Sequence, residues 1–234
     1  IDCEPKIGTV ELTQTGSCRY KAASLNYPVI SVDDCQLKSL ETIGTGYSFI
    51  EGFTNLTGQN LRGKKVILFG YGKVGRGIVH ALQTQTQHVV IVEKNDFIIN
   101  TLKRQGFNAI AIQNINHIKD ELKTAFCAVT ATGSEGFVSK FLTKNDFNHV
   151  FLANMGAVDE YGDFFEKNDV LFDKKPINFS LLAPTKREFL DPILYAHNIA
   201  IDMLLRGVLP IGVQPFPTDL SNDIINEWQS IHSL

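Results

Sequence analysis

Three glycines in the middle of the chain have the spacing of a phosphate-binding turn. Gly70, Gly72 and Gly75 form G-x-G-x-x-G within the segment KVILFGYGKVGRG at residues 65–77. The first glycine of such a motif permits a tight turn, the second lets the backbone approach a pyrophosphate, and the third lets a helix lie close to the preceding strand. The ligand's negative charge would rest on the N-terminus of that helix. Because an ordinary structural turn also uses glycines, the flanking elements must decide between the two interpretations.

An acidic residue follows at the distance expected of a ribose-binding group. Residues 66–69 are an unbroken apolar run, typical of a central parallel strand, and a second strand at 88–92 leads into Glu93. Glu93 stands about 20 positions beyond the first glycine, where a carboxylate accepts hydrogen bonds from the adenosine ribose and repels a 2′-phosphate. The sequence therefore predicts a dinucleotide site that prefers NAD to NADP. An ordinary βαβ unit is the alternative.

The composition excludes several classes of protein. The 234 residues are 44% hydrophobic and 20% charged, which is enough for a full core in one large domain or two small ones. A formal charge of −3 without a Lys/Arg run argues against nucleic acid or a membrane as partner. The four cysteines show no metal-site spacing, and there is no signal-peptide pattern. We therefore expect a reduced, cytoplasmic protein with no metal.

Strand and helix patterns alternate along most of the chain. This alternation predicts an α/β fold, a Rossmann-type doubly wound parallel sheet. The expected strands are 27–32, 66–69, 88–92, 108–112, 126–130, 150–153 and a candidate at 176–179. The expected helices are 47–60, 74–83, 97–105 with Asp96 as its cap, 115–123, 188–205 and 222–231, while residues 209–217 hold three prolines and are not expected to be helical. We expect an NAD-binding domain at 47–206, flanked by a segment of a second, incomplete domain at 1–46 and a C-terminal extension at 207–234.

Small polar residues follow several of these strands. Parallel strands end at one edge of a sheet, and in an open α/β sheet that edge is the ligand crevice. Turns chosen only for their backbone conformation are the alternative for each residue alone. The residues at these strand ends are Thr130, Thr132, Gly133, Asn154, Met155, Gly156 and Asn178.

An ordered set of motifs from Gly8 to Trp228 resembles the S-adenosyl-L-homocysteine hydrolase family. The segment GTVELTQTG at 8–16 resembles the family's G-x-S-E-E-T-T-T-G, and YPVISVDDCQLKS at 27–39 resembles P-A-x-N-V-N-D-S-V-T-K-S. Residues 48–52 resemble S-L-x-D-G, 70–77 resemble G-Y-G-D-V-G-K-G, 129–133 resemble V-T-T-T-G, and 154–156 stand where the family has N-I-G. The glycine motif is shared by many dehydrogenases, whereas this order of motifs is specific.

The resemblance implies that NAD is the cofactor and that it oxidises a hydroxyl group of the substrate. It also implies that the substrate is a small, nucleoside-like molecule. The family's C-terminal tail reaches into a neighbouring subunit's NAD site, which implies a homo-oligomer. Residues 1–46 resemble the end of the family's substrate domain, most of which is not among these residues. The positions that match the family's cofactor-binding residues are Thr13, Thr15, Gly70, Gly72, Lys73, Val74, Gly75, Glu93, Thr130, Thr132, Gly133, Asn154, Met155, Gly156 and Asn178.

The catalytic half of the resemblance is incomplete. Lys38 matches the family lysine that works on the 3′-hydroxyl, and Asp34 lies in the same motif, but either a base or a surface lysine fits this position. Glu41 either replaces the aspartate that follows this lysine in the family or lies on a solvated helix face. Ala157 and Thr185 stand where the family has histidines, and neither transfers protons near neutral pH as imidazole does.

Two functions therefore remain open from the sequence. One is NAD-dependent hydride transfer on a nucleoside-like or hydroxylated substrate. The other is a catalytically inactive NAD-binding module with a regulatory or assembly role. A 2-hydroxyacid dehydrogenase is a weaker third alternative, because it needs a histidine–carboxylate pair and an arginine for which the sequence offers no convincing set.

Overall fold

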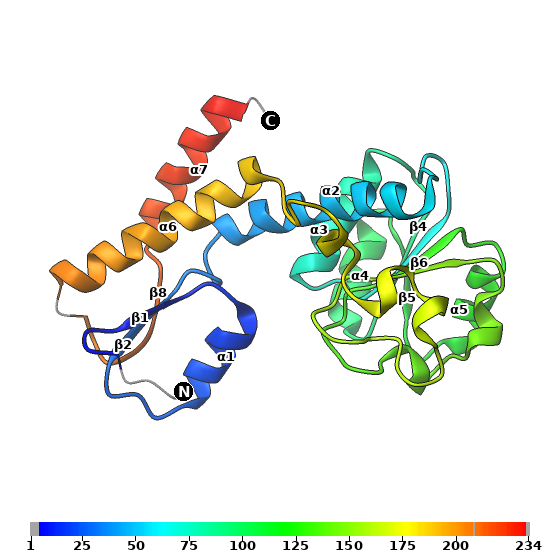
Figure 1. Cartoon of the computed structure of the whole chain (residues 1–234), viewed down its shortest axis with the longest axis horizontal. Coiled ribbons are helices and arrows are strands. Elements are labelled where there is room, and N and C mark those ends of the chain that lie inside the picture. Colours follow the sequence, from blue (N-terminus) through cyan, green and yellow to red (C-terminus); the bar gives the residue numbers. More distant parts are fainter. Residues whose placement is uncertain (1–4, 208, 233–234) are drawn as a thin grey trace. The chain divides into compact units, whose positions relative to one another are not determined.

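The chain forms two compact units. The structure is a computed structural model that describes residues 5–207 and 209–232. Thr42–Lys186 make up one unit, and the described residues on either side of them make up the other (Figure 1). This division lies after residues 41 and 186, whereas the sequence-based division lies after 46 and 206. The helix that follows Lys186 thus groups with the two ends of the chain.

The unit Thr42–Lys186 is built on a five-stranded parallel sheet. The strands are β3 (Val66–Phe69), β4 (Val89–Glu93), β5 (Asn108–Ala111), β6 (Cys127–Thr130) and β7 (Phe151–Asn154). Their order is β5-β4-β3-β6-β7, so the chain builds outward from β3 in one direction and then returns to build on its other side from β6. This reversal confirms the predicted doubly wound α/β fold, and it places a ligand crevice beside the end of β3.

Helices cover both faces of this sheet, which is why its strands are apolar at successive positions. Val66 and Leu68 belong to a core shared with α2 (Leu37–Thr57), α3 (Lys73–Gln83) and α4 (Asp96–Arg104). Ile67 and Phe69 point to the other face and belong to a core shared with α5 (Ile115–Leu122). Alternate side chains of β3 thus enter two separate cores.

The second unit has a smaller parallel sheet. Its strands β1 (Thr9–Glu11), β2 (Pro28–Ser31) and β8 (Gly212–Pro215) have the order β1-β2-β8. Its helices are α1 (Gln14–Ala22), α6 (Arg187–Arg206) and α7 (Thr218–His232). The indole nitrogen of Trp228 on α7 donates to the backbone oxygen of Glu188, and its ring lies 5.6 Å from that of Phe189, which joins α7 to α6.

Several expected elements differ from the structure. The cap of α4 is Asn95, whose side chain accepts from the backbone N–H groups of Phe97 and Ile98, so the prediction of Asp96 as cap was wrong. Residues 176–179 are not a strand, because Ile177–Ser180 form the 3₁₀ helix η5 and only Pro176 makes a bridge, to Asn154. Helix α2 begins ahead of the expected start at 47. Helix α1 and the strands β1 and β8 had not been predicted.

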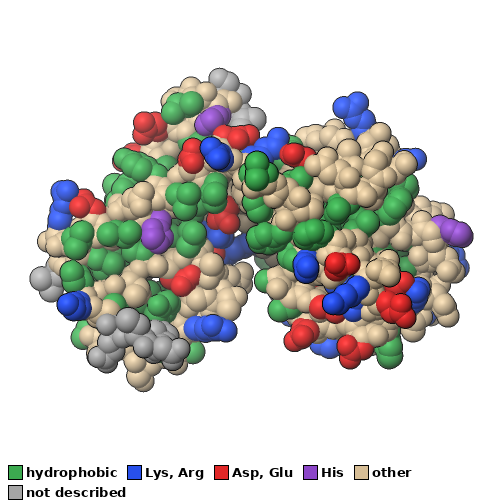
Figure 2. All heavy atoms as spheres, viewed as in Figure 1, with side chains coloured by type: hydrophobic (Ala, Val, Ile, Leu, Met, Phe, Trp, Pro, Cys, Tyr) green, Lys and Arg blue, Asp and Glu red, His purple; other side chains and the backbone are tan. Residues whose placement is uncertain are grey.

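On the face shown in Figure 2, acidic and basic side chains are interspersed over both units. Among the described residues, no helix has the length and hydropathy needed to cross a membrane, and no group of His, Cys, Asp and Glu has metal-site geometry.

Candidate functional site

A cavity of about 240 Å³ opens at the carboxyl ends of β3, β4 and β6. It is the position at which the strand order reverses. Polar, apolar and basic side chains all contribute to it. The residues that line it are Gly70, Tyr71, Gly72, Arg76, Val92, Glu93, Lys94, Asn95, Ile98, Ala131, Thr132, Ser134 and Phe137.

Glycine has a different structural role at each of the three positions in the turn. Gly70 has a φ of +95°, and a Cβ there would lie 2.6 Å from the backbone oxygen of Ala131. A Cβ on Gly75 would overlap the backbone oxygen of Gly70, so this glycine lets α3 lie against the turn. Gly72 lines the cavity and has no atom within 4 Å of the place where a Cβ would lie. Packing within the protein therefore does not require glycine at this position. The absence of a side chain leaves open space at the N-terminus of α3, where a phosphate could bind.

Glu93 joins the glycine turn to the end of β4. Its Oε2 accepts from the backbone N–H of Tyr71 at 2.9 Å, and its Oε1 accepts from those of Lys94 at 2.8 Å and Asn95 at 3.0 Å. The residue is only 9% exposed and borders the cavity. A carboxylate has about four lone-pair positions, so three backbone donors leave capacity for a ligand hydroxyl.

Two basic residues line the same cavity as this carboxylate. Arg76, on the first turn of α3, lies over the ring of Tyr71 at 5.9 Å from the centroid and donates to the Tyr71 backbone oxygen at 3.5 Å. Arg76 and Lys94 both line the cavity. Their charges, together with the helix N-terminus, make this side of the cavity favourable to an anion.

Thr130 and Asn154 meet at the sheet edge, as expected, but bind each other. The Thr130 hydroxyl donates to Asn154 Oδ1 at 3.0 Å, and the Asn154 amide donates to the backbone oxygens of Val158 at 2.7 Å and Lys174 at 2.6 Å. The N–H of Gly156 donates to the same Oδ1 at 2.9 Å. Asn154 therefore organises the loop after β7, and Met155 beside it is buried in the core.

Thr132 and Gly133 are held by a residue that the sequence did not single out. The carboxylate of Glu160 accepts from both of their backbone N–H groups and from the Thr132 hydroxyl. Glu160 is fully buried, and burial raises the pKa of its carboxyl although these hydrogen bonds oppose the shift. No spacing rule marks this glutamate, because its role depends on burial that the sequence does not display.

Asn178 has an unused acceptor. It lies on η5 and is 6% exposed, and its amide donates to the backbone oxygen of Pro184 at 3.0 Å. Its Oδ1 is buried and has no hydrogen-bond partner among the described residues. Because a buried acceptor without a donor is costly, this oxygen is suited to receive a ligand N–H or O–H.

Lys73 and Val74 lie in the first turn of α3, directly after the glycine turn. The remaining predicted residues belong to the other unit. Thr13 caps α1, where its hydroxyl accepts from the N–H of Gly16 and donates to Glu11, and Thr15 is exposed on the same helix. Asp34 pairs with Lys21 at 2.6 Å. Their assignment to cofactor binding or catalysis stays a prediction.

Lys38 is neither a free surface lysine nor an isolated base. Its Nζ donates to the backbone oxygen of Leu12 at 3.1 Å and to Glu41 Oε2 at 2.7 Å, and it lies 3.5 Å from Asp33 Oδ1. Two hydrogen bonds and one ion pair thus hold this ammonium group. Its side chain is 14% exposed, and Glu41 is bound to it instead of standing free on a solvated helix face.

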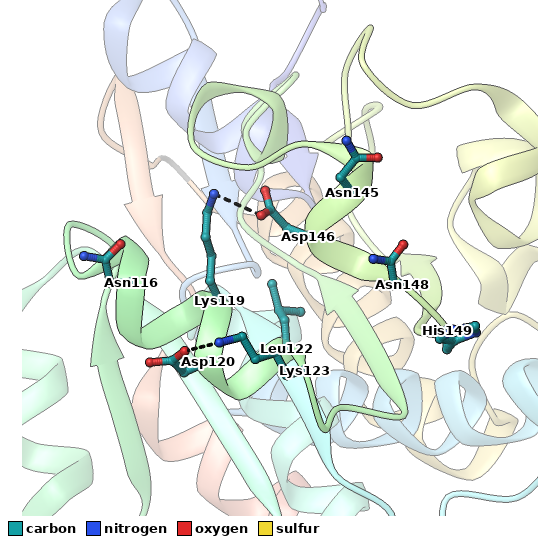
Figure 3. Close-up of a pocket in the computed structure, with 9 residues that line it drawn as sticks. All are labelled: Asn116, Lys119, Asp120, Leu122, Lys123, Asn145, Asp146, Asn148 and His149. Carbon is teal, nitrogen blue, oxygen red and sulfur yellow. Dashed lines mark hydrogen bonds and ion pairs between the residues drawn. The ribbon is translucent and has the colours of Figure 1, made fainter.

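A second hollow, of about 640 Å³, lies between α5 and the segment of the 3₁₀ helix η2 (Lys144–Phe147) (Figure 3). Lys119 pairs there with Asp146 at 2.9 Å, and Lys123 pairs with Asp120 at 2.7 Å. Both lysines are thus neutralised within the hollow. The cavity beside the glycine turn is the better candidate site, because it combines an open backbone, a helix N-terminus and an engaged carboxylate.

Comparisons with known proteins agree with this geometry. A family model described as S-adenosyl-L-homocysteine hydrolase, NAD binding domain, matches residues 41–178. An adenosylhomocysteinase of Sulfolobus acidocaldarius is 34% identical over 158 residues, covering 65% of this chain and 35% of the relative. That of Thermoplasma volcanium is 30% identical over 209 residues, covering 87% and 47%. An S-inosyl-L-homocysteine hydrolase of Methanocaldococcus jannaschii is 30% identical over 159 residues, covering 65% and 37%.

Solved structures show the same fold at low identity. A dipicolinate synthase chain from Bacillus halodurans gives a TM-score of 0.53 at 14% identity, covering 76% of this chain and 66% of that one. A dipicolinate synthase chain from Bacillus subtilis gives the same score and identity, covering 81% and 68%. This chain spans half or less of the length of the three relatives. Since the family model covers more than half of it, the chain belongs to the S-adenosyl-L-homocysteine hydrolase family and contains that family's NAD-binding domain.

Proposed function

We propose that this chain binds NAD in the cavity beside the glycine turn and uses it for hydride transfer with a hydroxylated, nucleoside-like substrate. The observation that carries the binding half is Gly72, whose open face lies at the N-terminus of α3 and borders the cavity. When bound, NAD supplies a hydride acceptor. The chain's own residues then bind it, orient it and move protons.

The cofactor's parts find matching groups around the cavity. The pyrophosphate is assigned to the backbone at Gly72, with Lys73 and Val74 in the first turn of α3 and Arg76 as counter-charge. The adenosine ribose is assigned to Glu93, which retains accepting capacity. The unused Oδ1 of Asn178 is assigned to an N–H or O–H of the cofactor.

Lys38 and Glu41 are the pair we assign to proton transfer. Their 2.7 Å contact is the specific observation that supports turnover, because it gives the lysine a carboxylate like the aspartate that follows it in the family motif. Lysine and glutamate side chains both act as general acids and bases, and these two lie within hydrogen-bond distance of each other. Asp34 stays in the proposal only as a neighbour in the same motif.

The alternative is an NAD-binding module without turnover. Its specific support is the loss of two imidazoles, since Ala157 has no proton to transfer and the Thr185 hydroxyl is hydrogen-bonded to that of Thr45 at 3.2 Å. The ammonium group of Lys38 is also already held by Leu12, Glu41 and Asp33. The two functions predict opposite results with substrate.

The substrate class comes from the relatives. Two are named adenosylhomocysteinase and one S-inosyl-L-homocysteine hydrolase, so we carry over only what the names share, a nucleoside joined to homocysteine. We further propose a homo-oligomer, on the family resemblance, and the cytoplasm as its compartment, on the widely spaced cysteines. Sedimentation velocity tests the first and cell fractionation the second.

Calorimetric titration of the full-length protein with NAD and NADP tests the binding. We expect tighter binding of NAD, and equal affinities would refute the assignment of Glu93. The protein with NAD is then incubated with adenosine or S-adenosylhomocysteine while NADH absorbance is followed. Reduction supports hydride transfer, and binding without reduction by either compound supports the module. A Lys38→Met variant is the control, because it should abolish reduction and leave NAD binding intact.

A further inference from the structure

Glu160 lies directly behind the wall of the NAD cavity. It is fully buried, and its Oε2 accepts from the Thr132 N–H at 2.8 Å and the Thr132 hydroxyl at 2.9 Å, while its Oε1 accepts from the Gly133 N–H at 2.6 Å. Thr132 and Ser134, on either side of Gly133, line the cavity. One carboxylate thus holds the backbone on which part of the cofactor wall is built.

The surroundings are shaped to admit this side chain. Gly156, after β7, would have its Cβ inside the carboxylate of Glu160, so only glycine leaves room for it. Gly133 has a φ of +71°, a left-handed conformation that its hydrogen bond to Glu160 stabilises. Two separate loops, after β6 and after β7, are therefore organised around one acidic group.

The neighbouring ionisable groups do not neutralise it. The donors that reach Glu160 belong to neutral residues. Asp159 beside it pairs with Lys174 at 2.9 Å; although burial opposes the shift, that lysine keeps the pKa of Asp159 below its ordinary value. Burial keeps the pKa of Tyr161 well above its ordinary value, so neither neighbour changes charge where Glu160 titrates.

We infer that Glu160 is a positioning residue for the cofactor: its ionised carboxylate holds Thr132 and Gly133 in the conformation that NAD requires. This rests on the proposed binding of NAD in the same cavity. An ionised carboxylate only accepts hydrogen bonds, which matches the three donors that face it. Glutamine has the same shape, but its amide would turn N–H groups toward at least one of these donors.

Burial makes stability and binding respond to pH in opposite directions. Because burial raises the pKa of Glu160, ionisation of this group lowers the free energy of unfolding as pH rises through that pKa. NAD affinity should rise over the same interval, which lies above the ordinary glutamate range. A residue that only stabilised the fold would not give this opposition.

The test compares the full-length protein with the variants Glu160→Gln and Glu135→Gln by NAD titration across pH. Glu135 is exposed in the same loop, so its variant removes the same charge without touching Thr132. We expect Glu160→Gln to weaken NAD binding by about tenfold or more, as for loss of a hydrogen bond to a charged group, and to lose the pH step. Glu135→Gln should bind as the unmodified protein does.

Equal or tighter NAD binding by Glu160→Gln would overturn the inference, and so would an unmodified protein whose affinity shows no rise with pH. If Glu160→Gln does not fold, the pH profile of the unmodified protein still decides. Failure of the proposed function looks different, since the unmodified protein would then bind no NAD at any pH.

Discussion

Gly70 and Gly72 belong to one motif, but we expect alanine at Gly70 to lower the stability of the protein and alanine at Gly72 to weaken NAD binding. At Gly70 the φ of +95° is unfavourable for alanine, and its Cβ would lie 2.6 Å from the Ala131 oxygen. Strain and overpacking each cost about 1–3 kcal/mol, so we expect Gly70→Ala to lower the free energy of unfolding by about 3 kcal/mol. The corresponding fall in melting temperature is about 6–12 °C for a chain of this size.

Gly72→Ala should leave the free energy of unfolding of the NAD-free protein unchanged. Gly72 has φ −76° and ψ −160°, which alanine adopts, and its Cβ would meet nothing within 4 Å. Alanine is poorer than glycine at a helix N-cap, by about 0.5–1 kcal/mol. It also reduces the entropy of the unfolded chain, which stabilises by about 0.4–1 kcal/mol, so the two effects offset each other.

The difference appears when NAD is added. Thermal unfolding is followed with NAD at about 100 times its dissociation constant for the unmodified protein, where ligand binding contributes about 2.7 kcal/mol. If the new methyl group weakens binding tenfold, this contribution falls to about 1.4 kcal/mol. A Gly72→Ala variant that NAD stabilises as fully as the unmodified protein would refute the placement of the pyrophosphate. A Gly70→Ala variant of unchanged stability would refute the role given to the turn.

Three further predictions concern charged groups. Glu93→Gln should narrow the preference for NAD over NADP about tenfold or more, measured by titration with both; an unchanged ratio would show that Glu93 does not select between them. Lys38→Met should lower the free energy of unfolding by about 1–3 kcal/mol in urea, because Glu41 loses its donor, and Lys38→Arg should lose less. The third prediction concerns Asp159. Burial alone would raise the pKa of this carboxyl, but the ion pair with Lys174 holds it below its ordinary value. The pair therefore contributes to the free energy of unfolding above about pH 4, and this contribution is lost as pH falls through the lowered pKa. In urea unfolding measured at a series of pH values, Asp159→Asn should show a smaller loss of stability at acid pH than the unmodified protein.

Much of the larger unit could be predicted because its strands are buried on both faces. The apolar runs at β3, β4 and β6 need no partner to be recognised, and the amphipathic α3 follows directly from the glycine turn. The smaller unit offered no such signal. In α1 only Ser17 is buried, so there is no apolar periodicity to detect. Strand β8 contains glycine and proline, and its partner β2 is far away in the sequence.

The candidate site divides in the same way. The glycine turn and the position of Glu93 at the end of β4 could be predicted, because both follow from residues that are close together in the sequence. The contact of Glu160 with Thr132 and the pairing of Thr130 with Asn154 could not, because they depend on which polar groups are buried together. The segment 176–179 looked like a strand because it is short and apolar, but only Pro176 makes a bridge to β7.

The contact between α6 and α7 contains an intrinsic fluorescent probe. Trp228 is the chain's single tryptophan, and it lies buried beside Phe189 in the smaller unit. Its emission therefore follows the unfolding of that unit, while far-ultraviolet circular dichroism follows both. NAD is proposed to bind in Thr42–Lys186, so a shift of the tryptophan transition on adding NAD would measure directly how strongly the two units are coupled.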